Sequence, residues 1–106
     1  MQFLIITKQT NPPPPEMVVP LVEAMKAWMA ENRASGKSKA IWSFAGTPGG
    51  GGIFEVDSHE ELDELMIGFP FGPFSSIEVF PLADIDQTLE VLKANFEKMM
   101  AMLGGQ

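Results

Sequence analysis

The sequence contains no cysteine and no tyrosine, one histidine, and only seven lysine and arginine residues among 106. Without cysteine the chain has no disulfide, no thiolate metal site and no cysteine nucleophile. A single histidine excludes any mechanism that needs two imidazoles. The net charge of −7, with no basic cluster, argues against nucleic acid and against an anionic membrane surface as partners.

Long apolar runs and ligand motifs are also missing. The apolar run in residues 1–7 has no basic region before it and is too short for a signal segment or a membrane span, so a cytoplasmic location is expected. No group of histidine and carboxylate residues has metal-ligand spacing, so we expect neither a metal nor a cofactor. The glycine run 49–52 lacks the helix and the Lys-Ser/Thr pair of a phosphate loop. Residues 47–52 predict instead a mobile hairpin connection that can move as a lid over a pocket.

What the sequence does contain is a series of strand signals. Short β-branched and aromatic runs, bounded by turn residues, predict β-strands. These runs cover residues 3–7, 39–46, 53–57 and 76–82.

Three helices are predicted from apolar periodicity and from end signals. The first begins at residue 18 or 19, because Pro20 is tolerated only in a first turn, and it ends at Ala34. Ser58 and Glu61 form a capping box that starts the second helix. Asp84 caps the last helix. The apolar stripe of this last helix consists of Ile85, Leu89, Leu92, Phe96, Met99 or Met100, and Leu103.

The order of these elements predicts the fold class. The succession β-α-β-β-α-β is that of a split βαβ unit, so we expect an α+β, ferredoxin-like sandwich with an antiparallel sheet and an added C-terminal helix. We expect residues 1–106 to form one domain. Its core is small, so an oligomer that buries one more face is expected.

Several short segments carry a family resemblance. They are Ser35-Gly36-Lys37, Ile41-Trp42, Ala45-Gly46, Ile53-Phe54-Glu55-Val56, Phe69-Pro70, Pro73-Phe74 and Ile77-Glu78-Val79. They fall, without gaps between residues 36 and 82, at the spacing of the muconolactone isomerase family, which the chain resembles over nearly its first eighty residues. The resemblance implies a dimeric α+β barrel, in which two protomers pack sheet against sheet, and therefore a homodimer or a larger even-numbered homo-oligomer.

The resemblance also points to polar groups that this chain lacks. Around Trp42 the family carries a histidine and an arginine, where this chain has Ala40 and Ser43. Tyrosines of the family correspond to Gly51 and Phe74. Without the arginine there is no bidentate clamp for a lactone carboxylate, and lysine is not an equivalent replacement. Isomerisation of muconolactone itself is therefore not expected.

Three polar residues are candidates for catalysis. Glu55 lies in the middle of a predicted central strand, where apolar neighbours would suit a proton shuttle. Lys39 is a candidate for holding an enolate or carboxylate, and Ser43 for helping to shift a proton. The alternatives are a salt bridge or a solvated sheet face for Glu55 and a solvated or edge-protecting role for Lys39.

Aromatic residues predict an apolar cavity for a planar or polyene-like ligand, although the same residues also suit a plain core. The substrate-binding candidates are Trp28, Trp42, Phe44, Phe69, Phe71 and Phe74.

Two classes of function stay open. The first is a small cofactor-independent enzyme of isomerase or cyclase type, which holds a hydrophobic, conjugated molecule in its reactive conformer. A cofactor-free monooxygenase is a variant that the resemblance implies. The second is a non-catalytic small-ligand-binding or assembly protein that kept the fold. The last helix, longer than the family's tail, is a candidate cover for a pocket or a subunit seam.

Overall fold

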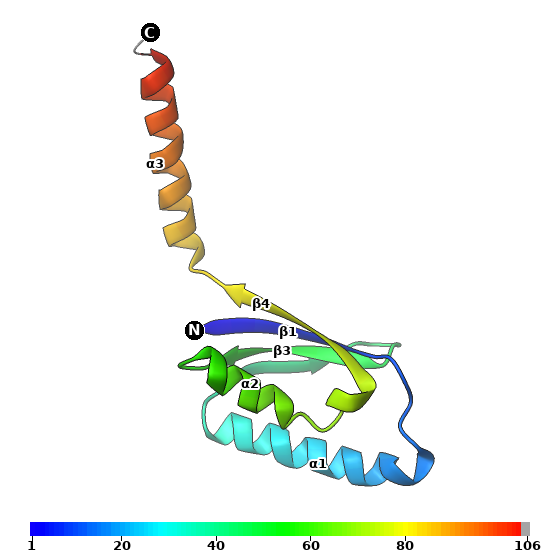
Figure 1. Cartoon of the computed structure of the whole chain (residues 1–106). Helices are drawn as coiled ribbons and strands as arrows, with labels where there is room; N and C mark the ends of the chain where they lie inside the picture. Colours follow the sequence, from blue (N-terminus) through cyan, green and yellow to red (C-terminus); the bar gives the residue numbers. More distant parts are fainter. Residues whose placement is uncertain (105–106) are drawn as a thin grey trace.

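The computed structural model describes residues 1–104 as a four-stranded sheet with two helices on one face and a third helix that projects away from it (Figure 1). All neighbouring strands are antiparallel, in the order β2-β3-β1-β4. This confirms the predicted α+β, ferredoxin-like sandwich with an added C-terminal helix. The pairing of two sheets stays a prediction. The elements are β1 (Gln2–Gln9), α1 (Pro15–Ala34), β2 (Ser38–Ser43), β3 (Gly49–Glu55), α2 (His59–Ile67), a 3₁₀ turn (Gly72–Phe74), β4 (Ser75–Leu82) and α3 (Ile85–Gly104).

The core lies between the sheet and its two covering helices. Side chains alternate between the two faces of a strand, and this period places Phe3 and Ile5 of β1 on the helix side. Phe54 of β3 is directly opposite Phe3 and shares that face. These side chains pack with Leu62 and Leu65 of α2 in one buried cluster. The alternation in β1 therefore decides which face of the sheet is covered.

The first helix begins earlier than the sequence predicted. It starts at Pro15 rather than at residue 18 or 19, and Pro20 lies inside it. Pro15 suits the first helical position because its fixed φ matches the helix. Pro20 removes one hydrogen bond, to the carbonyl four residues earlier at Glu16. Glu16 is exposed, so water can satisfy that carbonyl and the helix continues through the proline.

The glycine run is a strand, so the predicted lid is wrong. Gly49 to Gly52 form the first half of β3 and pair with β1, and Gly50 to Gly52 also pair with β2. The connection between β2 and β3 is shorter and comprises residues 44–48. A β-carbon on Gly51 would lie 3.0 Å from the Trp42 indole, and one on Gly52 would lie 2.7 Å from the Phe54 ring. The glycines are thus held inside the sheet, where neighbouring atoms occupy the space of their missing side chains.

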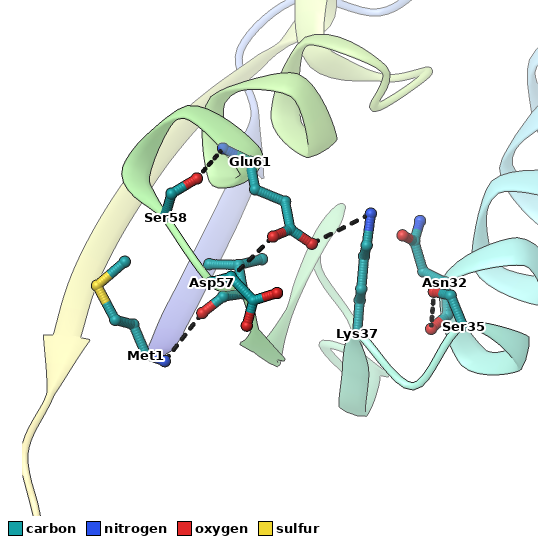
Figure 2. A network of polar contacts seen from close by, with 8 residues as sticks. Met1, Asn32, Ser35, Lys37, Asp57, Ser58 and Glu61 are labelled. Carbon is teal, nitrogen blue, oxygen red and sulfur yellow. Dashed lines mark hydrogen bonds and ion pairs between the residues drawn. The ribbon is translucent and has the colours of Figure 1, made fainter.

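The start of α2 confirms the predicted capping box (Figure 2). The Ser58 hydroxyl accepts a hydrogen bond from the Glu61 backbone N–H at 3.1 Å. The Glu61 carboxylate accepts one from the Asp57 N–H at 3.0 Å and lies 3.3 Å from the Lys37 ammonium. The Asp57 hydrogen bond, supported by Lys37 and opposed by burial, lowers the pKa of Glu61. The network ties the end of β3 to the beginning of β2.

The last helix, α3, stands apart from the rest of the molecule (Figure 1). Asp84 caps it as predicted, since its carboxylate accepts a hydrogen bond from the Asp86 N–H at 3.2 Å. The molecule is elongated, with extents of 72 × 28 × 23 Å. The large apolar side chains of α3 are all more than half exposed. Within residues 1–104 no helix has the length and apolarity needed to cross a membrane.

Candidate functional site

A cavity of about 470 Å³ lies between α1 and the helix-covered face of the sheet. Its walls come from every layer of the sandwich. α1 contributes Met25, Trp28 and Met29, α2 contributes Met66, and the following loop contributes Phe69 and Phe71. The connection between β2 and β3 contributes Pro48. From the sheet come Ile5, Thr7, Gln9, Ile41, Trp42, Ser43, Gly49, Gly50, Gly51, Phe54 and Ser75.

The floor of the cavity is bare because β3 has a glycine there. Gly50 pairs with Thr7 on one side and with Ser43 on the other, so the three residues form one row across the helix-covered face. A β-carbon on Gly50 would collide with the backbone carbonyl of Trp42. Because Gly50 has no side chain, none rises from β3 between the two hydroxyl residues, and the Trp42 carbonyl lies where a β-carbon would be. Neighbouring strands are about 4.8 Å apart, which puts the Thr7 and Ser43 backbones roughly 10 Å apart.

One end of the cavity is aromatic. The Trp28 ring lies 5.8 Å from the Phe54 ring and 5.4 Å from the Phe69 ring, measured between centroids. Its indole N–H donates a hydrogen bond to the Leu65 carbonyl at 3.3 Å. Because α2 ends two residues after Leu65, the Phe69 N–H bonds to the Met66 carbonyl instead. Trp28 therefore satisfies a carbonyl at the helix end and joins α1 to α2.

The other end of the cavity is polar but uncharged. Thr7 donates its hydroxyl proton to the Gly50 carbonyl at 3.3 Å. Ser43 lies across Gly50 from it, and Gln9 and Ser75 form the next pair along β1 and β4. Within residues 1–104 the lining includes no Asp, Glu, Lys, Arg or His. Any chemistry in this cavity thus depends on neutral hydroxyl and amide groups.

The structure brings only some of the predicted substrate-binding residues together. Trp28, Phe69 and Phe71 line the cavity, whereas Phe44 and Phe74 are absent from its lining. Trp42 also borders it, but its indole lies against Gly51, on the face of the sheet turned away from α1 and α2. The ligand-binding role of all these residues stays a prediction.

The predicted catalytic residues lie in different places. Ser43 lines the cavity, but Glu55 and Lys39 do not. Glu55 is opposite Gln2 on the other face of the sheet, and its carboxylate lies 3.3 Å from the N-terminal ammonium of Met1. Lys39 is exposed at a bulge in β2. No contact with the cavity supports a proton-shuttle role for Glu55 or an enolate-binding role for Lys39, and both roles stay predictions.

The polar residues at this end of the cavity, Thr7, Gln9 and Ser75, were not predicted from the sequence. Thr7 and Gln9 follow Ile5 at a spacing of two residues, which is the period of the strand face that Ile5 occupies. That signal was available for β1. It was not available for β3, because glycines carry no side chain whose alternation marks a face.

The comparisons with known proteins agree on one family. A family model described as Muconolactone delta-isomerase matches residues 1–87. The Muconolactone Delta-isomerases of Rhodococcus opacus and Acinetobacter baylyi are each 39% identical to this chain over 57 residues, or 54% of it. These matches cover 61% and 59% of those two proteins, so the chain spans about three fifths of their length.

Two solved structures are similar to this chain. Muconolactone isomerase superimposes with a TM-score of 0.72 at 24% identity, over 79% of this chain and 90% of that one. A 5-chloro-2-hydroxyhydroquinone dehydrochlorinase from Burkholderia phenoliruptrix, in complex with 2,5-dihydroxybenzoquinone, superimposes with a TM-score of 0.64 at 20% identity. That match covers 78% of this chain and 94% of the other. At these identities the likeness shows the fold alone.

Proposed function

The chain belongs to the muconolactone delta-isomerase family, and we propose that it is a small cofactor-independent enzyme of isomerase or cyclase type. Its substrate in this proposal is an uncharged, apolar, conjugated small molecule. The observation that carries the proposal is the cavity, which is lined by aromatic and methionine side chains and is polar only through neutral groups.

The lining argues for a neutral substrate. Burial of a carboxylate away from water is costly unless a cationic partner pairs with it. No cationic side chain from residues 1–104 reaches this cavity. A planar apolar molecule, in contrast, gains from contact with Trp28, Phe54 and Phe69. Conversion of muconolactone, a carboxylate, is outside the proposal.

The hydroxyl groups of Thr7 and Ser43 supply polar contacts to a ligand but are neither strong acids nor strong bases. Thr7 uses its proton on the Gly50 carbonyl, so its lone pairs are free to accept. The Ser43 hydroxyl makes no hydrogen bond to another residue of the 1–104 segment, which leaves its proton for a ligand. A carbonyl or hydroxyl seated over Gly50 would be oriented between the two. Because neutral hydroxyls are weak bases, we assign the rate enhancement mainly to holding one reactive conformer, with Ser43 as a hydrogen-bond donor.

We also propose that the enzyme is a homodimer or a larger even-numbered homo-oligomer. The sheet face turned away from α1 and α2 carries Leu4, Ile6, Trp42, Ile53 and Phe80. Trp42 and Phe80 are 39% and 43% exposed, so these apolar side chains are partly uncovered in one protomer, although the same face also carries Glu78 opposite Ile6. A second sheet packed on it would bury these side chains.

The reaction type can be tested by mass. Purified protein is incubated with a small-molecule extract of its own host, without added cofactor, and the products are followed by liquid chromatography and mass spectrometry. An isomerase removes one compound and forms another of identical mass, and a cyclase forms a product of identical mass or one that is lighter by one eliminated water. A product heavier by one oxygen atom would identify the monooxygenase alternative. Retention of an unchanged molecule in native mass spectra would identify a binding protein.

Two variants show whether the conversion of substrate takes place in the cavity. Met29→Trp adds bulk to the lining, and Val19→Trp makes a similar change on α1 at a side chain that is 70% exposed. The proposal expects loss of conversion in the first variant and parental conversion in the second. Equal conversion by both variants would show that the reaction occurs elsewhere on the protein.

A further inference from the structure

The apolar residues of α3 have the spacing of a coiled-coil seam. They recur in alternating steps of four and three residues along the whole helix, as the core positions of a heptad repeat do. The seam consists of Ile85, Leu89, Leu92, Phe96, Met99 and Leu103. No charged residue interrupts it. This helix is the part of the molecule that the family match explains least, because that match ends at residue 87.

The seam is uncovered in one protomer. Its six side chains are 53–64% exposed, and the adjacent Met100 and Met102 are 52% and 69% exposed. Full burial of a Leu, Ile, Met or Phe side chain contributes about 1.5–3 kcal/mol at about 25 cal/mol per Å², which corresponds to roughly 60–120 Å² each. Together they approach the area of about 800 Å² that one partner buries in a stable protein interface. A contiguous patch of this size indicates an interaction surface.

We propose that α3 pairs with α3 of a second copy of this chain, as a parallel two-stranded coiled coil. A seam of this periodicity is complementary to an identical seam, because each side chain fits between those of the facing helix. The helix leaves β4 after the two residues 83–84 and projects clear of its own domain, so a second helix can reach the seam (Figure 1).

The charges of α3 favour this partner and this orientation. The helix has three acidic and two basic residues, and such a balance gives no attraction to an anionic lipid surface. In a parallel, in-register pair, the positions that flank the seam place Thr88 of one helix beside Lys93 of the other, and Asn95 beside Met100. No two like charges meet across this pair. An antiparallel pair with full overlap would bring the two copies of Lys93 together.

The first test compares self-association of the full chain and two double variants by analytical ultracentrifugation. L92D with F96D places two acids in the seam. Q87D with A94D adds the same charge on the opposite side of the helix. The proposal expects at least a tenfold weaker self-association for the seam variant and parental behaviour for the control. Equal association constants for all three proteins would overturn it.

A second test is independent of any contact between sheets. Because the chain has no cysteine, single-cysteine variants report one position without background. Under mild oxidation, Leu92→Cys is expected to form at least tenfold more covalent dimer than Ala94→Cys on the outer side of the helix. Equal amounts from the two variants would refute the parallel seam. None of the varied residues lines the cavity. A variant that loses self-association but keeps its catalytic conversion therefore supports the paired helices independently of the proposed enzymatic function.

Discussion

The two tryptophans give a matched pair for testing how the cavity wall is held. Trp28→Phe keeps an aromatic ring beside Phe54 and Phe69 but removes the N–H that donates to the Leu65 carbonyl. Leu65 is 7% exposed, and within residues 1–104 its carbonyl has no other partner. Trp42→Phe makes the same chemical change on the opposite face of the sheet, at a residue that is 39% exposed.

The expected cost follows from the unpaired carbonyl. Leaving a buried acceptor without its donor lowers the free energy of unfolding by about 1–3 kcal/mol. For a domain of this size, each kcal/mol corresponds to roughly 4–8 °C in the melting temperature. Trp42→Phe leaves no buried acceptor unpaired within residues 1–104, so its cost should stay under about 1 kcal/mol.

Urea unfolding followed by far-ultraviolet circular dichroism measures both variants without relying on tryptophan fluorescence. Protein concentration is held equal, so that self-association enters every measurement in the same way. Trp28→Phe should unfold at a clearly lower urea concentration than Trp42→Phe. If the two variants lose the same stability, the Trp28 hydrogen bond does not hold the cavity wall in the way described.

Three further changes have defined outcomes. Ser43→Ala should lower turnover about 10- to 100-fold with unchanged stability. The control Ser76→Ala, on the other face of the sheet, should keep the parental turnover. Equal turnover in the two variants would show that Ser43 has no part in the mechanism. The native pKa of Glu61 lies below its ordinary value of 4.5, so its contribution to stability is present above that pH and is lost as pH falls through the lower native value. Glu61→Gln should therefore flatten the fall in unfolding free energy below pH 4.5 in acid titrations, and an unchanged slope would contradict this. Gly50→Ala drives a β-carbon into the Trp42 carbonyl and should cost about 1–3 kcal/mol in urea unfolding; a neutral result would show that the strand can shift.

The fold could be predicted because local signals agreed with one another. The capping residues Ser58 and Asp84, together with the β-branched and aromatic runs, predicted most element types, whereas the face that each strand buries was left open. The glycine run was misassigned because glycine has low strand propensity and no alternation to display. Gly50 pairs with Thr7 of β1 on one side and with Ser43 of β2 on the other. These tertiary contacts override the low strand propensity of glycine.

The site was predicted less well because function here depends on which sheet face each residue occupies. Glu55 drew attention as a carboxyl in a central strand, but β3 pairs so that it shares a face with Gln2 rather than with the cavity. The bulge near Lys39 was equally invisible in the pattern of β2. Aromatic content indicated a cavity, and Trp28 and Phe69 do line it. For its uncharged polar end the sequence contained a signal only in β1, where Thr7 and Gln9 follow Ile5 at the strand period, and none in the glycines of β3.

The most direct test of the account is to compare two small aromatic probes by isothermal titration calorimetry at neutral pH. The probes 1-naphthol and 1-naphthoate share one ring system and differ in a neutral hydroxyl against a carboxylate. A cavity with an aromatic wall and only neutral polar groups should bind 1-naphthol at least tenfold more tightly, and Met29→Trp should abolish that binding. Equal or tighter binding of 1-naphthoate would show that a cationic group reaches the ligand, and would contradict the central claim.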